Sequence, residues 1–412
     1  MQSVQHVSTS LNMNKFATIL VLQALTLIPN FSETAFSPLL IHLQQSWHLR
    51  VELAELPFSI YLAGMATGLL YWGLLADRKK HKPLLAKGLT LYCISCLLCW
   101  LSPNIYFFTL ARFSQGLFAV IASVMTLVII RKLFNQTNER AKIHSYIGMS
   151  LSVSPALGPL FGMHFADSNN WQNMFAVLAL IVALVALAAH LRLPETGENT
   201  ENKFSISVVR EIIQDRQLIF YATIAGLAIA NAMVFFALSP YYYEVIYHLS
   251  TSQFSLLFIC IAASWVAGSL YAQMLIKRFG TTNTIHIGCY GAILFSCIGV
   301  LFTYYERVLG PFIVPASIAT ICLTMVHTGT IIPNCISMAL ANRNSHVGTA
   351  SSIMGFTYNF VAAIITSLAC LGPQSNPHYF HTIFLIINLS TLMMLTYYTS
   401  TSRNALTYEK AQ

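Results

Sequence analysis

Long apolar runs separated by short charged turns fill almost the whole chain. The clearest turn is Gly73–Pro83, which gathers Asp77, Arg78, Lys79, Lys80, His81 and Lys82 between two such runs. An apolar run of about 20 residues is long enough to cross a bilayer as a helix. Of the 412 residues, 56% are hydrophobic and only 9% are charged, which is too apolar for a soluble core. We therefore expect an all-α membrane protein in which Gly73–Pro83 turns on one membrane face.

The apolar runs predict twelve transmembrane helices, at about residues 16–41, 56–76, 84–102, 104–130, 145–166, 172–191, 218–241, 254–276, 284–304, 311–338, 346–370 and 379–399. The one long polar segment, Pro194–Arg216, divides them into two groups of six. We expect an N-terminal six-helix bundle over 1–193, a linker over 194–217 and a C-terminal six-helix bundle over 218–412. Within the linker, Ser205–Gln214 has the composition of a short amphipathic helix.

The distribution of Lys and Arg predicts the orientation. With both termini in the cytoplasm, 19 of these residues lie in cytoplasmic segments and only Arg50 and Arg307 lie in extracytoplasmic turns. Short cytoplasmic loops collect Lys and Arg, so this asymmetry predicts a multi-pass protein of the cell inner membrane with cytoplasmic termini. The net charge of +8 therefore comes from the Lys and Arg residues of the cytoplasmic segments and does not indicate a nucleic-acid partner.

Glu33 and Arg112 are the charged residues that fall inside apolar runs. A charge at bilayer depth costs about 2.5–3.5 kcal/mol on insertion scales, so such residues usually face a cavity and carry function. Glu33 is a candidate proton carrier or counter-ion for a cationic substrate; the alternative is a solvated position near the surface. Gln115, one helical turn from Arg112, is placed to share its hydrogen bonds. The alternative for Arg112 is a side chain that reaches toward the membrane surface.

Several classes of site are absent from the sequence. It has no phosphate-binding Walker loop, no metal-ligand cluster and no nucleophile elbow, so we expect neither an enzyme nor a cofactor. The nine Cys all lie in apolar runs, where small polarizable residues that pack helices are expected.

Seven stretches, taken in order, carry a resemblance to a known family. They are Gly73-Leu-Leu-Ala-Asp-Arg78, Arg112-Phe-Ser-Gln-Gly116, Pro155-Ala-Leu-Gly-Pro-Leu-Phe-Gly162, Leu193-Pro-Glu-Thr196, Leu238-Ser-Pro240, Pro333-Asn334 and Gly348-Thr-Ala-Ser-Ser-Ile-Met-Gly355. Their order and spacing resemble the major facilitator superfamily and, within it, the Bcr/CflA group of drug-resistance proton antiporters. The turn departs from the family pattern at Lys80, where Gly is usual, and at His81, where Arg or Lys is usual.

The resemblance implies roles for particular residues. It makes Glu33, Arg112 and Gln115 the proton-coupling group. The residues that would gate the conformational change are Gly73, Asp77, Arg78, Gly158, Pro159 and Gly162. Asp77 would lie against the N-terminus of the eleventh helix, and the helix 5 glycines would allow close approach to a partner helix. The central cavity would be lined by Tyr61, Asn231, Phe235, Phe236, Tyr358 and Asn359.

The function implied is proton-coupled export of small amphipathic molecules or drugs by alternating access of two bundles. Its partners would be a small-molecule substrate, protons and the lipid bilayer, and the protein would act as a monomer. Export of an endogenous metabolite or siderophore, and proton-coupled uptake, remain alternatives. A receptor or enzyme built on a transporter scaffold is a third possibility from another class.

Overall fold

The computed structural model describes residues 15–76, 78–134, 143, 154–166, 170–196, 206–341, 347–373 and 376–409. The described chain is almost entirely helical. Its first half contains α2 (Lys15–Thr34), η1 (Ser37–Leu39), α3 (Leu40–Ser46), α4 (Val51–Ala76), α5 (His81–Trp100), α6 (Ile105–Ala119), α7 (Ile121–Leu133), a helix over 154–166 and α9 (Asn173–Arg192).

The second half begins with the short α10 (Ile206–Ile213), which covers most of the predicted amphipathic segment. The remaining elements are α11 (Arg216–Pro240), the π-helix η2 (Tyr241–Ile246), α12 (Thr251–Tyr304), α13 (Glu306–Leu309), η3 (Gly310–Phe312), α14 (Ile313–Leu340), α15 (Val347–Cys370) and α16 (Pro377–Glu409). Ile212 of α10 is fully buried in an apolar cluster that includes residues of α11. The apolar face of α10 is therefore covered by other helices.

Ten of the described helices are long and apolar enough to cross a membrane. One of them, α12, is two helices that meet at Gly280, whose φ of 78° is not helical. The helix over 154–166 lies in the predicted fifth span, part of which is outside the described residues. Together these helices match the twelve predicted spans, and the all-α membrane fold is confirmed.

The outer face of α9 shows why this fold needs a bilayer. Met174, Leu178 and Val182 are buried in the protein, whereas Leu180 and Leu184 are more than half exposed. A helix that is apolar on both its buried and its exposed face suits a lipid environment.

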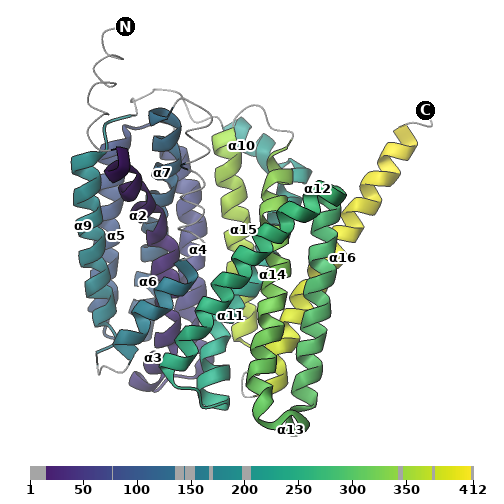
Figure 1. Cartoon of the computed structure of the whole chain (residues 1–412). Coiled ribbons are helices and arrows are strands. Elements are labelled where there is room, and N and C mark those ends of the chain that lie inside the picture. The colour runs from purple at the N-terminus through teal and green to yellow at the C-terminus, as the bar shows by residue number, and fades with distance from the viewer. Residues whose placement is uncertain are drawn as a thin grey trace.

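The helices stand side by side in two groups (Figure 1). Elements up to α9 lie in one group and elements from α10 onward lie in the other, with the start of α2 and the end of α16 at the same end of the molecule. The groups meet where α4 packs against α15. Gly73, near the end of α4, faces Ser352 near the start of α15, and Leu69 of α4 faces Gly355. Residue numbers decrease along α4 in the direction in which they increase along α15, so the two helices run antiparallel.

The first predicted span is broken. We predicted one helix over 16–41, but α2 ends at Thr34 and the chain resumes as η1, with Pro38 in its first turn, and then α3. Proline lacks the backbone N–H that a continuous helix needs at that point, so a helix rarely runs through it unchanged. The break places Glu33 in the last turn of α2.

The two halves repeat one unusual turn. Trp47-His48-Leu49 follows α3, and Tyr247-His248-Leu249 follows η2 two hundred residues later. The two histidines, with φ values of 50° and 55°, are the described non-glycine residues with positive φ. That conformation is uncommon outside glycine. The same spacing relates Gly68 and Gly268, each of which packs against the backbone of a neighbouring helix, α6 or α14. We infer that the halves are an internal repeat.

The segment after α9 caps the start of α5. The residue that precedes α5, Lys80, makes no side-chain cap, and Glu195 Oε1 instead accepts hydrogen bonds from the backbone N–H groups of His81 (2.9 Å) and Lys82 (3.4 Å). The His81 ring bonds to Thr196 Oγ1 and to the carbonyl oxygen of Ala76, at the end of α4. The Leu193–Thr196 motif therefore holds both ends of the charged turn, and His81 serves there as a polar link.

Replacing Glu195 should loosen this turn. Glu195→Ala removes an anionic acceptor from the first turn of α5, which we expect to cost about 1–2 kcal/mol, as the loss of other helix caps does. Thermal unfolding in detergent measures it. The control is Glu52→Ala, because Glu52 pairs with the exposed Arg50 at 3.3 Å and should contribute little. Equal melting temperatures for Glu195→Ala and the wild type would contradict the capping role.

Candidate functional site

Glu33 and Arg112 both lie inside the first half of the protein. Glu33 is 2% exposed and Arg112 is fully buried, so neither occupies a solvated or lipid-facing position. Their charges act on each other across the interior. Arg112 Nη1 donates a hydrogen bond to Oε1 of Gln115, as the spacing of three residues on α6 suggested. The three residues of the predicted proton-coupling group therefore lie together, from α2 and α6.

Aromatic rings surround the Arg112 guanidinium. Its central carbon lies 4.2 Å from the ring centre of Tyr61, 4.8 Å from that of Phe36 and 5.8 Å from that of Phe175. A desolvated guanidinium over aromatic faces gains about 2 kcal/mol from each favourable contact. Tyr61 is in turn fixed, because its hydroxyl donates a 2.8 Å hydrogen bond to the carbonyl oxygen of Pro29. Tyr61, predicted as a cavity residue, thus belongs to the Arg112 site.

Several buried polar atoms at this site have no hydrogen-bond partner among the described residues. They are Oε1 of Glu33 and Nε and Nη2 of Arg112. A buried polar atom without a partner costs about 1–3 kcal/mol, so such atoms are rarely left unpaired. Three such atoms on one buried carboxylate and one buried guanidinium indicate a site that takes up water, a proton or a polar ligand.

The sequence did not point to all members of this site. Cys96 and Cys99 were expected only to pack helices, but Gln115 Nε2 donates to Cys96 Sγ at 3.1 Å and Cys99 lies 4.0 Å from Gln115 Oε1. Tyr92, Cys96 and Cys99 share one face of α5, four and three residues apart. That spacing was the available signal; an aromatic hydroxyl and two thiols on one helix face suit a polar interior.

The helix over 154–166 packs tightly on the broken first helix. A side chain at Gly158 would meet Thr34 Oγ1 and the backbone N of Ala35, and one at Gly162 would meet the carbonyl oxygen of Ala35. Pro159 lies buried between them. The partner helix, which the sequence did not identify, is therefore α2 at the residues that follow Glu33. These glycines fix the end of the helix that carries the carboxylate.

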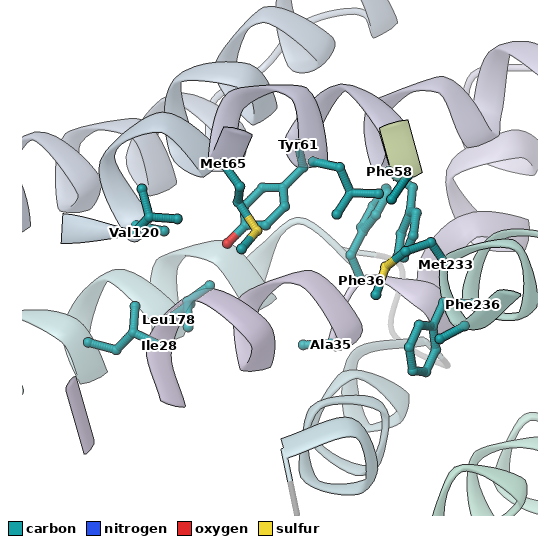
Figure 2. Packing of buried hydrophobic residues seen from close by; sticks show 14 of the residues in the cluster. Ile28, Ala35, Phe36, Phe58, Tyr61, Met65, Val120, Leu178, Met233 and Phe236 are labelled. Carbon is teal, nitrogen blue, oxygen red and sulfur yellow. The ribbon is translucent and has the colours of Figure 1, made fainter. Parts of the chain in front are cut away.

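The second half contributes a separate aromatic cluster. Phe236 stacks on Phe258 with a ring-centre distance of 5.4 Å and lies 6.4 Å from Phe58 of α4 (Figure 2). The Ser37 hydroxyl donates to the carbonyl oxygen of Phe236, and Phe235 packs edge-on against Phe258. Phe236 thus joins the two halves at the end of the molecule that holds α3.

The other predicted cavity residues lie apart from the Arg112 site. Asn231 is buried in the second half, where its Nδ2 donates to Asn388 Oδ1 at 3.1 Å while its own Oδ1 has no partner among the described residues. Tyr358 lies on α15, and its hydroxyl approaches Gly355 where that helix faces α4. Asn359 Nδ2 donates to the carbonyl oxygen of Gly355. The structure therefore does not gather the six predicted cavity residues into one cluster.

Of the predicted gating residues, Gly73 lies where α4 meets α15. A side chain at Gly73 would meet Ser352, in the second turn of α15, so the signature turn sits beside the beginning of the eleventh helix. Arg78 follows the end of α4, and its backbone N–H bonds to the carbonyl oxygen of Leu75. Asp77 lies outside the described residues. The contact predicted for it stays a prediction.

Two expectations from the sequence were wrong. The position of Tyr241–Tyr243 at the end of the predicted seventh span favours an aromatic belt at the membrane surface. Tyr242 and Tyr243 are instead buried, and Tyr242 stacks on Phe380 at 4.2 Å. Glu33 was taken as the only acid well inside an apolar run. Because α4 begins at Val51, five residues earlier than predicted, Glu55 lies in its second turn and is 2% exposed.

An all-helical bundle that spans the membrane and holds buried charges on broken or tightly packed helices defines a class of membrane transporter. The chain belongs to the Major Facilitator Superfamily, whose family model matches residues 24–367. It is 23% identical over 395 residues to the bicyclomycin resistance protein homolog of Haemophilus influenzae, covering 94% of this chain and 97% of that one. It is 24% identical to the multidrug resistance protein MdtM of Escherichia coli K12, covering 81% of each chain.

Solved structures agree on the fold. The crystal structure of a D-xylose-proton symporter matches with a TM-score of 0.72 at 16% identity, covering 92% of this chain and 97% of that one. A bacterial homologue of the iron transporter ferroportin in its inward-facing state matches with a TM-score of 0.70 at 13% identity, covering 94% and 99%. At these identities the likeness concerns the fold alone.

The packing of Gly162 generates a test of the site. In Gly162→Ala the new methyl group would meet the Ala35 backbone and displace the end of α2, which we expect to cost about 1–3 kcal/mol as overpacking does elsewhere. Melting temperature and substrate transport should both fall. The control is Leu157→Ala on the same helix, because Leu157 is 43% exposed. A Gly162→Ala protein with wild-type stability and transport would contradict the role of this contact.

Proposed function

We propose that the protein is a proton-coupled exporter that moves small amphipathic molecules, drugs among them, across the inner membrane by alternating access. Relatives that cover most of the chain include a bicyclomycin resistance protein homolog and multidrug resistance proteins. The observation that carries the proton coupling is the buried pair of Glu33 and Arg112, three of whose polar atoms have no hydrogen-bond partner among the described residues. In this proposal both termini face the cytoplasm.

The chemistry of the pair suits proton exchange. Burial at 2% exposure opposes a charged carboxylate at Glu33, whereas the guanidinium of Arg112 favours one. Because an Arg side chain stays protonated, the balance changes only when water, a proton or a substrate reaches the site. A cationic or strongly polar substrate would compete with the proton for Glu33, and Arg112 would assist release of the proton.

In this proposal, access to the buried site changes because the two halves of the protein move relative to each other. We propose that residues 1–193 and 218–412 rock as two units connected by 194–217. The seam between α4 and α15 would remain as a pivot, since the two helices pack closely at Gly73 against Ser352 and at Leu69 against Gly355. The short η1 and the positive-φ turn at His48 lie on the segment that joins the carboxylate to this seam. Access to Glu33 would thereby change as the halves move.

Proteoliposomes with an imposed pH gradient test the coupling. Glu33→Gln keeps the shape of the side chain but cannot ionise, so proton-driven substrate flux should fall at least about tenfold, as loss of a charge-assisted interaction of 1.5–3 kcal/mol would give. The matched control is Glu52→Gln, because Glu52 lies on the surface in an ion pair with Arg50. Flux in Glu33→Gln equal to that of the control would contradict the role of Glu33.

Arg112 variants test the second member of the pair. Arg112→Lys keeps a positive charge but loses the planar contact with the Tyr61 and Phe36 rings and the fork that bonds to Gln115. We expect it to retain part of the flux and to shift its pH dependence, whereas Arg112→Ala should abolish coupling. The same pH profile for wild type and both variants would overturn this assignment.

The direction of flux distinguishes the alternatives. A substrate panel in a deletion strain, with and without a protonophore, should show energy-dependent loss of drugs from the cells. Specific loss of a self-made metabolite would indicate an endogenous exporter, and accumulation would indicate an uptake symporter.

A further inference from the structure

A hollow on the outside of the first half opens between the first turns of α2 and the last turns of α9. Its volume is about 430 Å³, within the range of roughly 300–1,000 Å³ found for sites that hold small molecules. α9 stands at the outer edge of its group of helices (Figure 1), so this α2–α9 groove does not open toward the second half. Its apolar walls are formed by Ala17, Leu20 and Val21 of α2 and by Leu184, Leu187 and Leu191 of α9.

The spacing of the residues on α9 explains the shape of the groove. Leu184, Leu187 and Leu191 are three and four residues apart, so they form one ridge along the helix, and each is more than half exposed. Ala188 lies among them and is less exposed, so its small side chain forms a floor that a larger one would fill. The result is an apolar channel that follows α9 for about 10 Å, at 1.5 Å per residue from Leu184 to Leu191.

A cation lies at one end of the groove. Arg192, the last residue of α9, lines the groove and is exposed. The membrane span of α9 ends at this residue, and the first span begins at Phe16, beside Ala17. The guanidinium therefore lies at the level of the lipid head groups, while the apolar walls extend into the membrane. Because a guanidinium binds phosphate through two parallel hydrogen bonds, Arg192 is a favourable partner for a lipid phosphate.

We propose that the α2–α9 groove binds an anionic phospholipid, with one acyl chain along the leucines of α9 and the head-group phosphate on Arg192. The groove matches this ligand at both ends, because its walls take a hydrocarbon chain and its cation takes an anion. A zwitterionic lipid fits the walls equally well, but its ammonium group weakens the attraction to Arg192. One Arg near the membrane surface favours an anionic lipid by about fivefold. The bound lipid holds the start of α2 against α9, and the last turn of α2 carries Glu33.

Photo-crosslinking of lipids to the full chain in vesicles tests this proposal. The vesicles contain phosphatidylethanolamine and phosphatidylglycerol, a trace of one of which carries a diazirine in its acyl chain, and labelled peptides are identified by mass spectrometry. The phosphatidylglycerol probe should label residues 16–23 and 184–192 about fivefold more than the phosphatidylethanolamine probe does. Residues 290–301 of α12, where Leu294 and Leu301 are also exposed, should be labelled equally by both probes.

Matched variants separate the groove from general effects of charge and bulk. Arg192→Gln should remove the preference for phosphatidylglycerol at the two segments, and Ala188→Trp, which fills the floor, should reduce their labelling by both probes. Lys87→Gln removes an exposed cation near the start of α5, and Ala183→Trp adds the same bulk to another exposed position of α9. Neither control should change the labelling of the groove.

Three outcomes would overturn the proposal. Equal labelling of the two segments by both probes in the wild type would show that the groove takes any bilayer lipid. An equal loss of preference in Lys87→Gln and Arg192→Gln would show a general effect of surface charge. Labelling by neither probe would show that another partner, such as a second copy of the chain, covers the groove. The test needs neither a transported substrate nor a pH gradient, so a failure of the proposed export function would leave this inference standing.

Discussion

A charge that is kept away from water is the constraint on which this structure depends. Arg112 is fully buried and is held by Gln115 and by three aromatic rings. A guanidinium in such a place needs a counter-charge or polar partners, and Glu33 supplies the nearby acid. The close packing of the helix over 154–166 on Thr34 and Ala35 holds that acid in place. The helix break, the glycines and the aromatic rings all serve to position one ionisable pair.

A single helix pair connects this site to the movement of the protein. α4 carries Phe58, Tyr61 and Gly73 in succession, so it contacts Phe236 of the second half, the Arg112 site and the start of α15 at the signature turn. The turn is itself fixed by Glu195 at the start of α5. A shift of α4 relative to α15 would therefore change the contacts at all three places. In the proposed mechanism, this arrangement would connect protonation of Glu33 to movement of one half against the other.

Much of the fold was predictable because hydropathy alone decides which segments enter a bilayer. The sequence spacing of Arg112 and Gln115 also predicted that their side chains would meet, since residues three apart share a helix face. The packing partners of helices were not predictable. Gly158 and Gly162 indicated that their helix packs closely on another, but only the structure identified Thr34 and Ala35 as the residues they contact. Glu55 was missed because it stands at the edge of an apolar run, where a short error in the start of a helix decides between surface and interior. The buried positions of Tyr242 and Tyr243 were missed because η2 continues past Pro240 toward α16.

The central claim is that Glu33 exchanges a proton for substrate within the buried site. Proton release on substrate binding tests it directly, by following a pH indicator in weakly buffered detergent solution as a transported drug is added. The account predicts release of a proton by the wild-type protein and none by Glu33→Gln, with binding still detectable in both. Equal release by the two proteins would contradict it.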